Sequence, residues 1–539
     1  MEGNLVLILD DNRIEANKEK LATKSRYFAS LFSGNFNDSN SKEHTINYDI
    51  TLFTLQSFIE WIHDDDECED FHCHSIKQSM TKFMGDNFTD LIYLLQLSVL
   101  FTVDELKNDI IDIIILFWLV PEKVVDIWLL TQELCIKELQ DICLSVCLER
   151  FEELPPISLV DLPKDSFMNL LQNVNITAST EYLKLIRQEW LWRHEHIPHV
   201  AEERHPRFTQ ATVGYVQSST SKVVSTDACL YTWDGTNFSK FMQLRNDLLS
   251  ERWMSGMQVT GRGFSIYTVG GEMGIGTGKF NNYIWRYCLI SKKWYYYAKL
   301  PVPRRHMIVA FMDYKLVIVG GVGRHRLKLF TVDILDTHRG TWSSGARIPE
   351  DFIQVPYYCV MDGKLFVIKS ELYIYYPEED YWATISINQK PCLVKNGACL
   401  AYDALMFLDS RPVGSAETVL LKIDVLRDED CETDSDDSLT DSELTDTDIT
   451  DTEITDAEIS DILSDTDIME TEILYEDDDY QFRYAEVAGI GVVIVSNRCN
   501  KGYRYLRVHT ELRRDLESTI LPRIQCFNFI DPDTLYNTV

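Results

Sequence analysis

The sequence predicts a multidomain chain of three parts: an α/β domain, an all-α domain and an all-β domain built from repeats. Three observations support this fold class. Strand and helix patterns alternate over residues 1–118, helical patterns dominate residues 119–200, and short apolar strands recur through residues 205–539. A chain of 539 residues is also too long for one hydrophobic core, so several domains are required.

The α/β domain is predicted from the spacing of its apolar residues. The apolar run from Leu5 and the segment that begins at Arg13 are typical of a strand pair that leads into a helix, which Gly34 ends. Residues 53–62 and 87–115 also place apolar side chains at helical spacing. Residues 64–86 are polar and lack such a period, so we expect an inserted loop there.

Repeated glycine pairs and tryptophans mark the all-β domain. The pairs Gly270-Gly271 and Gly320-Gly321 are 50 residues apart, and Trp294, Trp342 and Trp382 recur at gaps of 48 and 40. A four-strand unit that repeats at this spacing predicts a β-propeller. We expect six blades, with the divergent segments 208–250 and 485–539 closing the ring.

The glycine-rich stretch after the first pair does not match a nucleotide site. A phosphate-binding loop needs glycine six residues before its lysine and a hydroxyl residue after it. Met273 and Phe280 occupy those places around Lys279. A dinucleotide fingerprint must open a helix, but strand-like residues follow Gly278. We therefore expect no cofactor, and we assign the glycine pair to close backbone approach.

Charge and apolar content indicate the location of the chain. The net charge is −34, and most of it lies in residues 428–479, which contain no Lys or Arg. Nucleic acid is not an expected partner, because the remaining chain is not basic. No signal peptide or membrane-spanning run is apparent, so we expect a soluble protein of the cytoplasm, with the nucleus or cytoskeleton as alternative locations.

Neither a metal site nor a catalytic site is expected. Cys68, His72, Cys73 and His74 are possible zinc ligands, but no second ligand pair follows at zinc-finger spacing. The thirteen cysteines are scattered, as suits free thiols in a reducing compartment. No nucleophile or metalloprotease motif is present, so we expect a binding role rather than catalysis.

The three parts together resemble the BTB-BACK-Kelch family. Residues 13–34 and 91–110 resemble a BTB domain, and residues 185–195 resemble the end of a BACK domain. In the last part, a double glycine closes one strand, a tyrosine such as Tyr283 follows, and a tryptophan lies in the last strand of each repeat, as in Kelch repeats. The resemblance covers nearly the whole chain.

This resemblance implies a substrate adaptor of a cullin-3 ubiquitin ligase. The BTB domain would bind cullin-3, the propeller would bind the substrate, and other subunits would perform the chemistry. A homodimer through the BTB domain is implied, although this chain reaches its first strand at Leu5 without the helix that family members exchange. The alternative is a scaffolding or actin-associated Kelch protein with no ligase role.

The family's cullin contact is a hydrophobic-x-Glu motif just after a BTB helix. Phe36, Asn37 and Asp38 match it here, with aspartate in place of glutamate. The alternative for Phe36 is that its ring packs beneath its own loop.

Two basic loops are the candidate substrate site on one propeller face. Their residues are Arg304, Arg305, His306, Arg324 and Arg326. Arginine binds carboxylates and phosphates bidentately, which predicts an acidic or phosphorylated degron. The alternative is that these side chains are merely solvated.

Residues 428–479 are expected to form a disordered insert within the propeller. Ile or Leu recurs about every five residues between acids and threonines, a period that fits neither a helix nor a strand. Three roles are compatible with this composition: recruiting a basic partner, pairing in cis with the arginine loops, or solubilising the chain.

Overall fold

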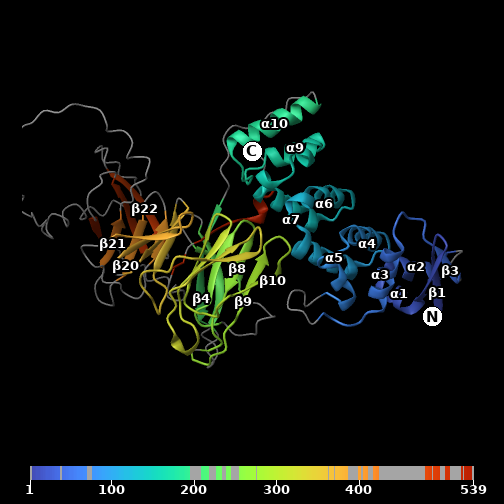
Figure 1. Cartoon of the computed structure of the whole chain (residues 1–539), viewed down its shortest axis with the longest axis horizontal. Helices are drawn as coiled ribbons and strands as arrows, with labels where there is room; N and C mark the ends of the chain where they lie inside the picture. The colour runs from blue at the N-terminus through green and yellow to red at the C-terminus, as the bar shows by residue number, and fades with distance from the viewer. Residues whose placement is uncertain are drawn as a thin grey trace, which may run out of the picture.

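The computed structural model has an elongated outline in which the N-terminal domain, a helical arm and the strand-rich part follow one another (Figure 1). The structure describes residues 3–36, 39, 41–68, 76–194, 208–217, 226–233, 238–244, 254–274, 276–361, 363–369, 371–385, 398–401, 405–410, 417–423, 480–487, 490–497, 504–509, 524–525 and 527–536. The acidic segment 428–479 therefore lies outside the described residues.

The N-terminal domain combines a small sheet with helices. Strand β1 (Asn4–Leu9) pairs with β2 (Asn12–Asn17) antiparallel and with β3 (Glu43–Thr45) in parallel. Alternate residues of β1 are buried, which explains its apolar pattern. The helices are α1 (Lys18–Lys24), α2 (Arg26–Leu31), α3 (Leu52–His63), the 3₁₀ helix η1 (Gln78–Phe83), α4 (Phe88–Leu100) and α5 (Asp104–Ile113). Asn17, Ser25 and Thr51 cap the starts of α1, α2 and α3 through their side-chain oxygens.

A helical arm continues from α5. Its elements are η2 (Ile114–Trp118), α6 (Pro121–Glu133), α7 (Lys137–Glu149), η3 (Phe151–Glu153), α8 (Pro156–Val160), α9 (Lys164–Leu171) and α10 (Thr180–His194). Proline opens α6 and α8, where its missing N–H costs no hydrogen bond. Across the described part of the chain, every helix is too short or too polar to cross a bilayer.

The remainder is a β-rich domain of antiparallel sheets. Its described strands are β4 (Phe208–Gln217), β5 (Thr226–Trp233), β6 (Phe238–Gln243), β7 (Gln258–Arg262), β8 (Ser265–Val269), β9 (Tyr283–Cys288), β10 (Lys293–Lys299), β11 (Ile308–Met312), β12 (Lys315–Val319), β13 (Val332–Asp336), β14 (Thr341–Gly345), β15 (Tyr357–Met361), β16 (Lys364–Ile368), β17 (Leu372–Tyr376), β18 (Tyr381–Ile385), β19 (Ala398–Ala401), β20 (Leu405–Ser410), β21 (Glu417–Ile423), β22 (Tyr480–Val487), β23 (Ile490–Asn497), β24 (Arg504–His509), β25 (Ile524–Gln525) and β26 (Phe527–Ile530). Three consecutive sheets, β7 to β10, β11 to β14 and β15 to β18, each contain four strands in chain order.

The first and fifth sheets join distant parts of the chain. Strand β26 pairs with β4, so the last described strand completes the first sheet. Strand β24 pairs with β21, which makes residues 424–503 an insertion within the fifth sheet, and β22 and β23 form a separate hairpin inside it. The described residues thus form five large sheets rather than the six blades predicted, and these sheets do not form a closed ring. The physical reason is that β24 pairs with β21 in the fifth sheet, whereas the sequence predicts a separate blade from residues 485–539.

The repeated tryptophans occupy the same place in successive sheets. Trp294, Trp342 and Trp382 lie in the fourth strands β10, β14 and β18. In each sheet the tryptophan is opposite a bulky residue of the preceding strand. Two of these partners are tyrosines, with ring centroids 5.1 and 4.9 Å from the tryptophan rings. Tyr283 begins strand β9. The repeat in the sequence therefore corresponds to a repeated cross-strand pair.

The glycine pairs end the second strands of two sheets in a left-handed backbone conformation. Gly270 and Gly271 have φ of 60° and 100°, and Gly320 and Gly321 have φ of 59° and 93°. A Cβ atom on Gly270 would lie 2.6 Å from the carbonyl oxygen of Arg304, and one on Gly321 would lie 2.8 Å from that of Arg305. Both the backbone angle and the close neighbouring loop therefore require glycine.

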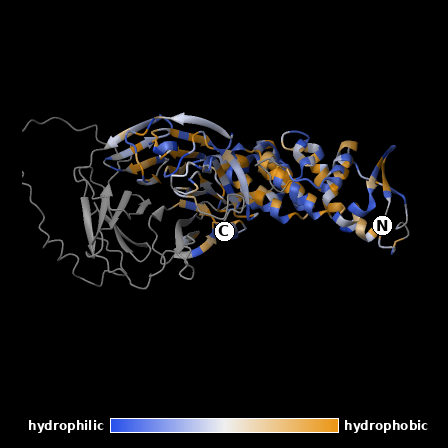
Figure 2. Ribbon diagram, turned by 90° about the horizontal axis from the view of Figure 1, so that it is seen from below, coloured by the Kyte–Doolittle hydropathy of each residue, from blue (hydrophilic) through white to orange (hydrophobic). Residues whose placement is uncertain are grey.

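A single apolar core runs from the N-terminal domain through the helical arm into the β-rich domain. It includes Phe28 and Trp61 at one end, Trp128 in the arm, and Phe264 and Tyr295 in the adjoining sheet. Figure 2 shows apolar residues along the arm and into the neighbouring strands. Burial of shared apolar surface is the main force that holds these parts together.

A buried carboxyl group lies inside this core. The indole Nε1 of Trp61 donates a hydrogen bond to Asp109 Oδ2 at 2.8 Å. Burial raises the pKa of Asp109 to about 7, despite the hydrogen bond from Trp61, which favours the charged form. The unfolded chain would release this proton near the ordinary aspartate pKa of 3.8.

Replacing Asp109 with asparagine should therefore stabilise the protein increasingly as pH rises. The folded state keeps a proton that the unfolded state loses between about pH 4 and 7, so the free energy of unfolding falls over this window. Asparagine keeps the acceptor for Trp61 and removes this loss, a gain on the order of 4 kcal/mol at pH 8. Thermal denaturation of the full-length chain at pH 5 and pH 8 measures the difference.

The matched control is Asp104→Asn on the same helix. Hydrogen bonding and charge from Lys107 lower the pKa of Asp104, so this change should give no gain that increases with pH. Equal responses of the two variants to pH would show that Asp109 carries no burial penalty.

Candidate protein-interaction site

Arg304, predicted to contact a substrate, lies inside the β-rich domain. Its side chain is fully buried and forms an ion pair with Asp333 of β13. Its Nη1 donates to the carbonyl oxygen of Gly320 at 3.2 Å. A guanidinium held in this way connects two loops and has no surface to offer a ligand. The prediction that Arg304 contacts the substrate is therefore wrong, because burial beside Asp333 makes it a structural residue.

Arg305 and His306 also hold loops together. The Nε of Arg305 is 3.1 Å from Glu272 Oε2, and both side chains are buried. The backbone of Arg305 exchanges two hydrogen bonds with Val322, at 3.0 and 2.8 Å. The amide of His306 donates to Gly256 at 2.9 Å. The two basic motifs of the sequence thus lie side by side, but the first acts mainly as a support for the second.

Arg324 and Arg326 are exposed at the tip of the β12–β13 loop. A short 3₁₀ turn, η4 (Arg324–Arg326), carries them, and backbone hydrogen bonds between Gly323, Arg324 and Leu327 close the loop. Neither arginine forms an ion pair within the described part of the chain. These two guanidinium groups remain available for carboxylates or phosphates.

Four loops are joined into one surface, which we call the loop face: residues 270–282, 300–307, 320–331 and 346–356. Arg305 joins the first two loops through Glu272, and Lys328 joins the last two through Asp351 at 2.9 Å. The amide of Ile348 also donates to Phe330 at 3.0 Å. The loops therefore support one another without a ligand.

The loop face also exposes apolar side chains that sequence reasoning missed. They are Met273, Val302, Leu327, Phe330 and Ile353. Leu327 is 64% exposed and Ile353 is 58% exposed. Only Val302, between two prolines and just before the first basic motif, and Leu327, within the second, had a signal in the sequence. Cations mixed with exposed apolar groups are typical of a peptide-binding surface.

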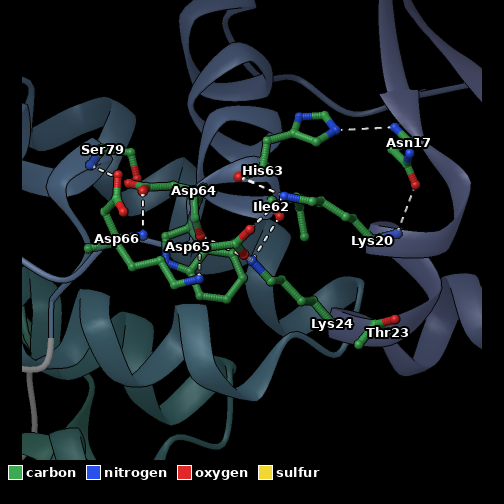
Figure 3. Close-up of polar contacts among 12 residues, drawn as sticks. Asn17, Lys20, Thr23, Lys24, Ile62, His63, Asp64, Asp65, Asp66 and Ser79 are labelled. Atoms are coloured by element: carbon green, nitrogen blue, oxygen red, sulfur yellow. Dashed lines mark hydrogen bonds and ion pairs between the residues drawn. The ribbon is translucent and has the colours of Figure 1, made fainter.

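Lysines in the N-terminal domain gather at the end of α3. Figure 3 shows Lys20 and Lys24 converging on the last carbonyl groups of this helix, with Nζ–O distances of 3.0 Å to His63 and 2.8 Å to Ile62. Their hydrogen bonds lower the pKa of Asp65 to about 2. Cations at this position offset the negative end of the helix dipole. The cluster therefore stabilises the edge of the domain and is not a free binding site.

Phe36 lies in the turn after α2 and projects into solvent. The hydroxyl of Ser39 accepts a hydrogen bond from the Phe36 amide at 3.1 Å and donates one to its carbonyl at 2.7 Å. The ring is 57% exposed, so it does not pack beneath its own loop. Asn37 and Asp38, the other predicted cullin contacts, lie outside the described residues, as do three of the four candidate zinc ligands.

Comparison with known protein families identifies the N-terminal domain. The BTB/POZ domain profile matches residues 3–114. Residues 3–114 form a BTB/POZ domain. The BTB part of the prediction is therefore confirmed. No curated protein matches the chain.

The BTB domain touches the β-rich domain directly. Asp112 of α5 accepts hydrogen bonds from Lys293 Nζ and from the Tyr295 hydroxyl, both at 3.0 Å. Burial and the nearby Asp112 raise the pKa of Tyr295, which keeps its hydroxyl neutral and able to donate. The Asp112 carboxylate thus forms an ion pair with Lys293 and accepts a hydrogen bond from Tyr295, both on strand β10.

Further contacts join the helical arm to the sheets. Arg262 pairs with Glu149, and His338 Nδ1 lies 2.7 Å from Glu153 Oε1. Near the last described residues, Asn173 donates to the Leu535 carbonyl at 2.6 Å. Arg262 and His338 belong to the ends of the sheets opposite the loop face, so the helical arm packs there and leaves the loop face uncovered by these contacts.

The buried and exposed arginines should respond differently to alanine. Arg304→Ala is expected to lower the free energy of unfolding by about 3–5 kcal/mol, because Asp333 would remain buried without its counter-charge. Arg324→Ala should change it by less than about 0.5 kcal/mol. Chemical denaturation of the full-length variants measures both. The double change of Arg304 and Asp333 to alanine should recover part of the loss, and equal small effects of the single changes would contradict a buried pair.

Proposed function

We propose that this chain is a substrate adaptor of a cullin-3 ubiquitin ligase. The BTB domain binds cullin-3, and the loop face binds the protein to be ubiquitinated. The observation that carries the proposal is a BTB domain at residues 3–114 joined through a helical arm to a β-rich domain with a basic and apolar loop face. In this proposal the arm is a BACK domain and the β-rich domain is a Kelch propeller.

The cullin contact is assigned to the turn after α2. An exposed aromatic ring is the type of side chain that contributes most to protein interfaces, and Phe36 supplies one. Asp38 adds a carboxylate two residues later. The chain acts in the cytoplasm as a BTB-mediated homodimer and contributes binding rather than catalysis.

The substrate contact is assigned to Arg324 and Arg326. Their exposed guanidinium groups fit carboxylates or phosphates, and Leu327 beside them fits an apolar residue. The substrate class is therefore an acidic or phosphorylated peptide that also carries apolar side chains.

Capture of purified cullin-3 by the immobilised full-length chain tests the proposal. The intact chain should retain cullin-3, and Phe36→Ala should weaken capture about tenfold or more, as for an aromatic interface anchor. Asp38→Lys should weaken it further by reversing a charge. Leu185→Ala is the matched control, because Leu185 is about as exposed as Phe36 but lies on α10.

Failure of the intact chain to retain cullin-3 would favour the alternative, a scaffolding or cytoskeletal protein without a ligase role. Equal weakening by Phe36→Ala and Leu185→Ala would instead remove Phe36 from the contact.

A further inference from the structure

The loop face carries unneutralised positive charge on a very acidic chain. The three carboxylates of its loops are engaged: Glu272 with Arg305, Asp351 with Lys328, and Glu350 with Lys369 and the Tyr373 hydroxyl. Four exposed cations of these loops form no ion pair with any residue that the structure describes: Lys279, Arg324, Arg326 and Arg347. The whole chain has a net charge of −34, so this local excess runs against the composition. Such a patch attracts an anionic ligand.

The same chain contains a segment of complementary chemistry. Residues 428–479 have no Lys or Arg, and from 439 to 459 an apolar residue recurs every five positions between acids and threonines. These residues are Leu439, Leu444, Ile449, Ile454 and Ile459. Arginine pairs with carboxylates in bidentate fashion, and the exposed Leu327 and Ile353 can receive the apolar residues. Charge alone would fit any acid, whereas this segment matches both features of the loop face.

We propose that the loop face binds the acidic segment 428–479 of its own chain. The proposal rests on the proposed function only in taking the loop face as the binding surface of the β-rich domain. An incoming acidic substrate then competes with this segment.

The connection to the fifth sheet permits this contact. The insertion leaves the sheet at Ile423 and the chain is next described at Tyr480, with 56 residues between them. The insertion follows the third strand of its sheet, as the β13–β14 turn does, so it starts at the end opposite the loop face. Residue 440 is 17 residues beyond Ile423, and a coil of 17 residues spans on the order of 20–25 Å, or up to about 55 Å when extended. The fifth sheet lies beside the fourth, because β19 contacts β15. Attachment to the same chain gives an effective concentration of about 1 mM, so a weak intrinsic affinity is sufficient.

Binding of a labelled peptide of residues 440–462 provides the test, with fluorescence anisotropy as the measurement. A full-length chain whose Asp and Glu in 428–479 are changed to Asn and Gln has a vacant loop face and should bind the peptide. The unaltered chain should bind the peptide at least about tenfold more weakly, because its own segment competes at high effective concentration. A chain lacking 428–479 provides a second vacant form.

Two sets of changes identify the surface. In the neutralised chain, Arg324→Glu with Arg326→Glu should reduce peptide affinity about tenfold or more at low salt. Arg339→Glu is the matched control, since Arg339 is exposed in the β13–β14 turn at the other end of the sheet. Changing Ile449 and Ile454 of the peptide to serine, with its charge unchanged, should also weaken binding.

Equal binding to the unaltered and neutralised chains would overturn the proposal, as would no binding to either vacant form or equal effects of the loop-face and control changes. If the difference in peptide affinity between the unaltered and neutralised chains depends on protein concentration, the segment binds a second copy of the chain. That result would also overturn binding in cis. Cullin-3 capture is measured separately and does not require Arg324 or Arg326. The adaptor role and the segment's docking can therefore fail independently.

Discussion

The carboxylate of Asp112 holds the two halves of the molecule in position. It is almost fully buried, and a buried carboxylate costs several kcal/mol unless charge and hydrogen bonds compensate it. Lys293 and Tyr295 supply both from one strand, β10. Separating this sheet from α5 would leave the carboxylate uncompensated. The position of α5 relative to this sheet is consequently set by packing rather than by a linker.

Charge has two distinct roles within the loop face. Arg304 and Arg305 are buried beside Asp333 and Glu272, where they hold neighbouring loops at close approach. Arg324 and Arg326 lie on top of that support and remain exposed. A preorganised loop loses less entropy when it binds a ligand, so the buried pairs favour binding without touching the ligand.

Local repetition made much of the fold predictable, whereas long-range pairing did not. The tryptophans recur because each occupies the same cross-strand position, so their spacing could indicate repeated sheets. Nothing near Arg304 indicates that Asp333, 29 residues later, buries it. No local pattern shows that β24 returns to β21 across residues 424–503. The exposure of Phe36 likewise depends on how Ser39 folds the turn back.

The pairing of β26 with β4 has a consequence for biosynthesis. About 310 residues separate the end of β4 from the start of β26. At a synthesis rate of about 5–20 residues per second, the first sheet waits roughly 15–60 s for its missing strand. During that interval one edge of β4 has no partner, and an open edge invites pairing with other chains. A nascent chain of this protein therefore carries that open edge until β26 emerges.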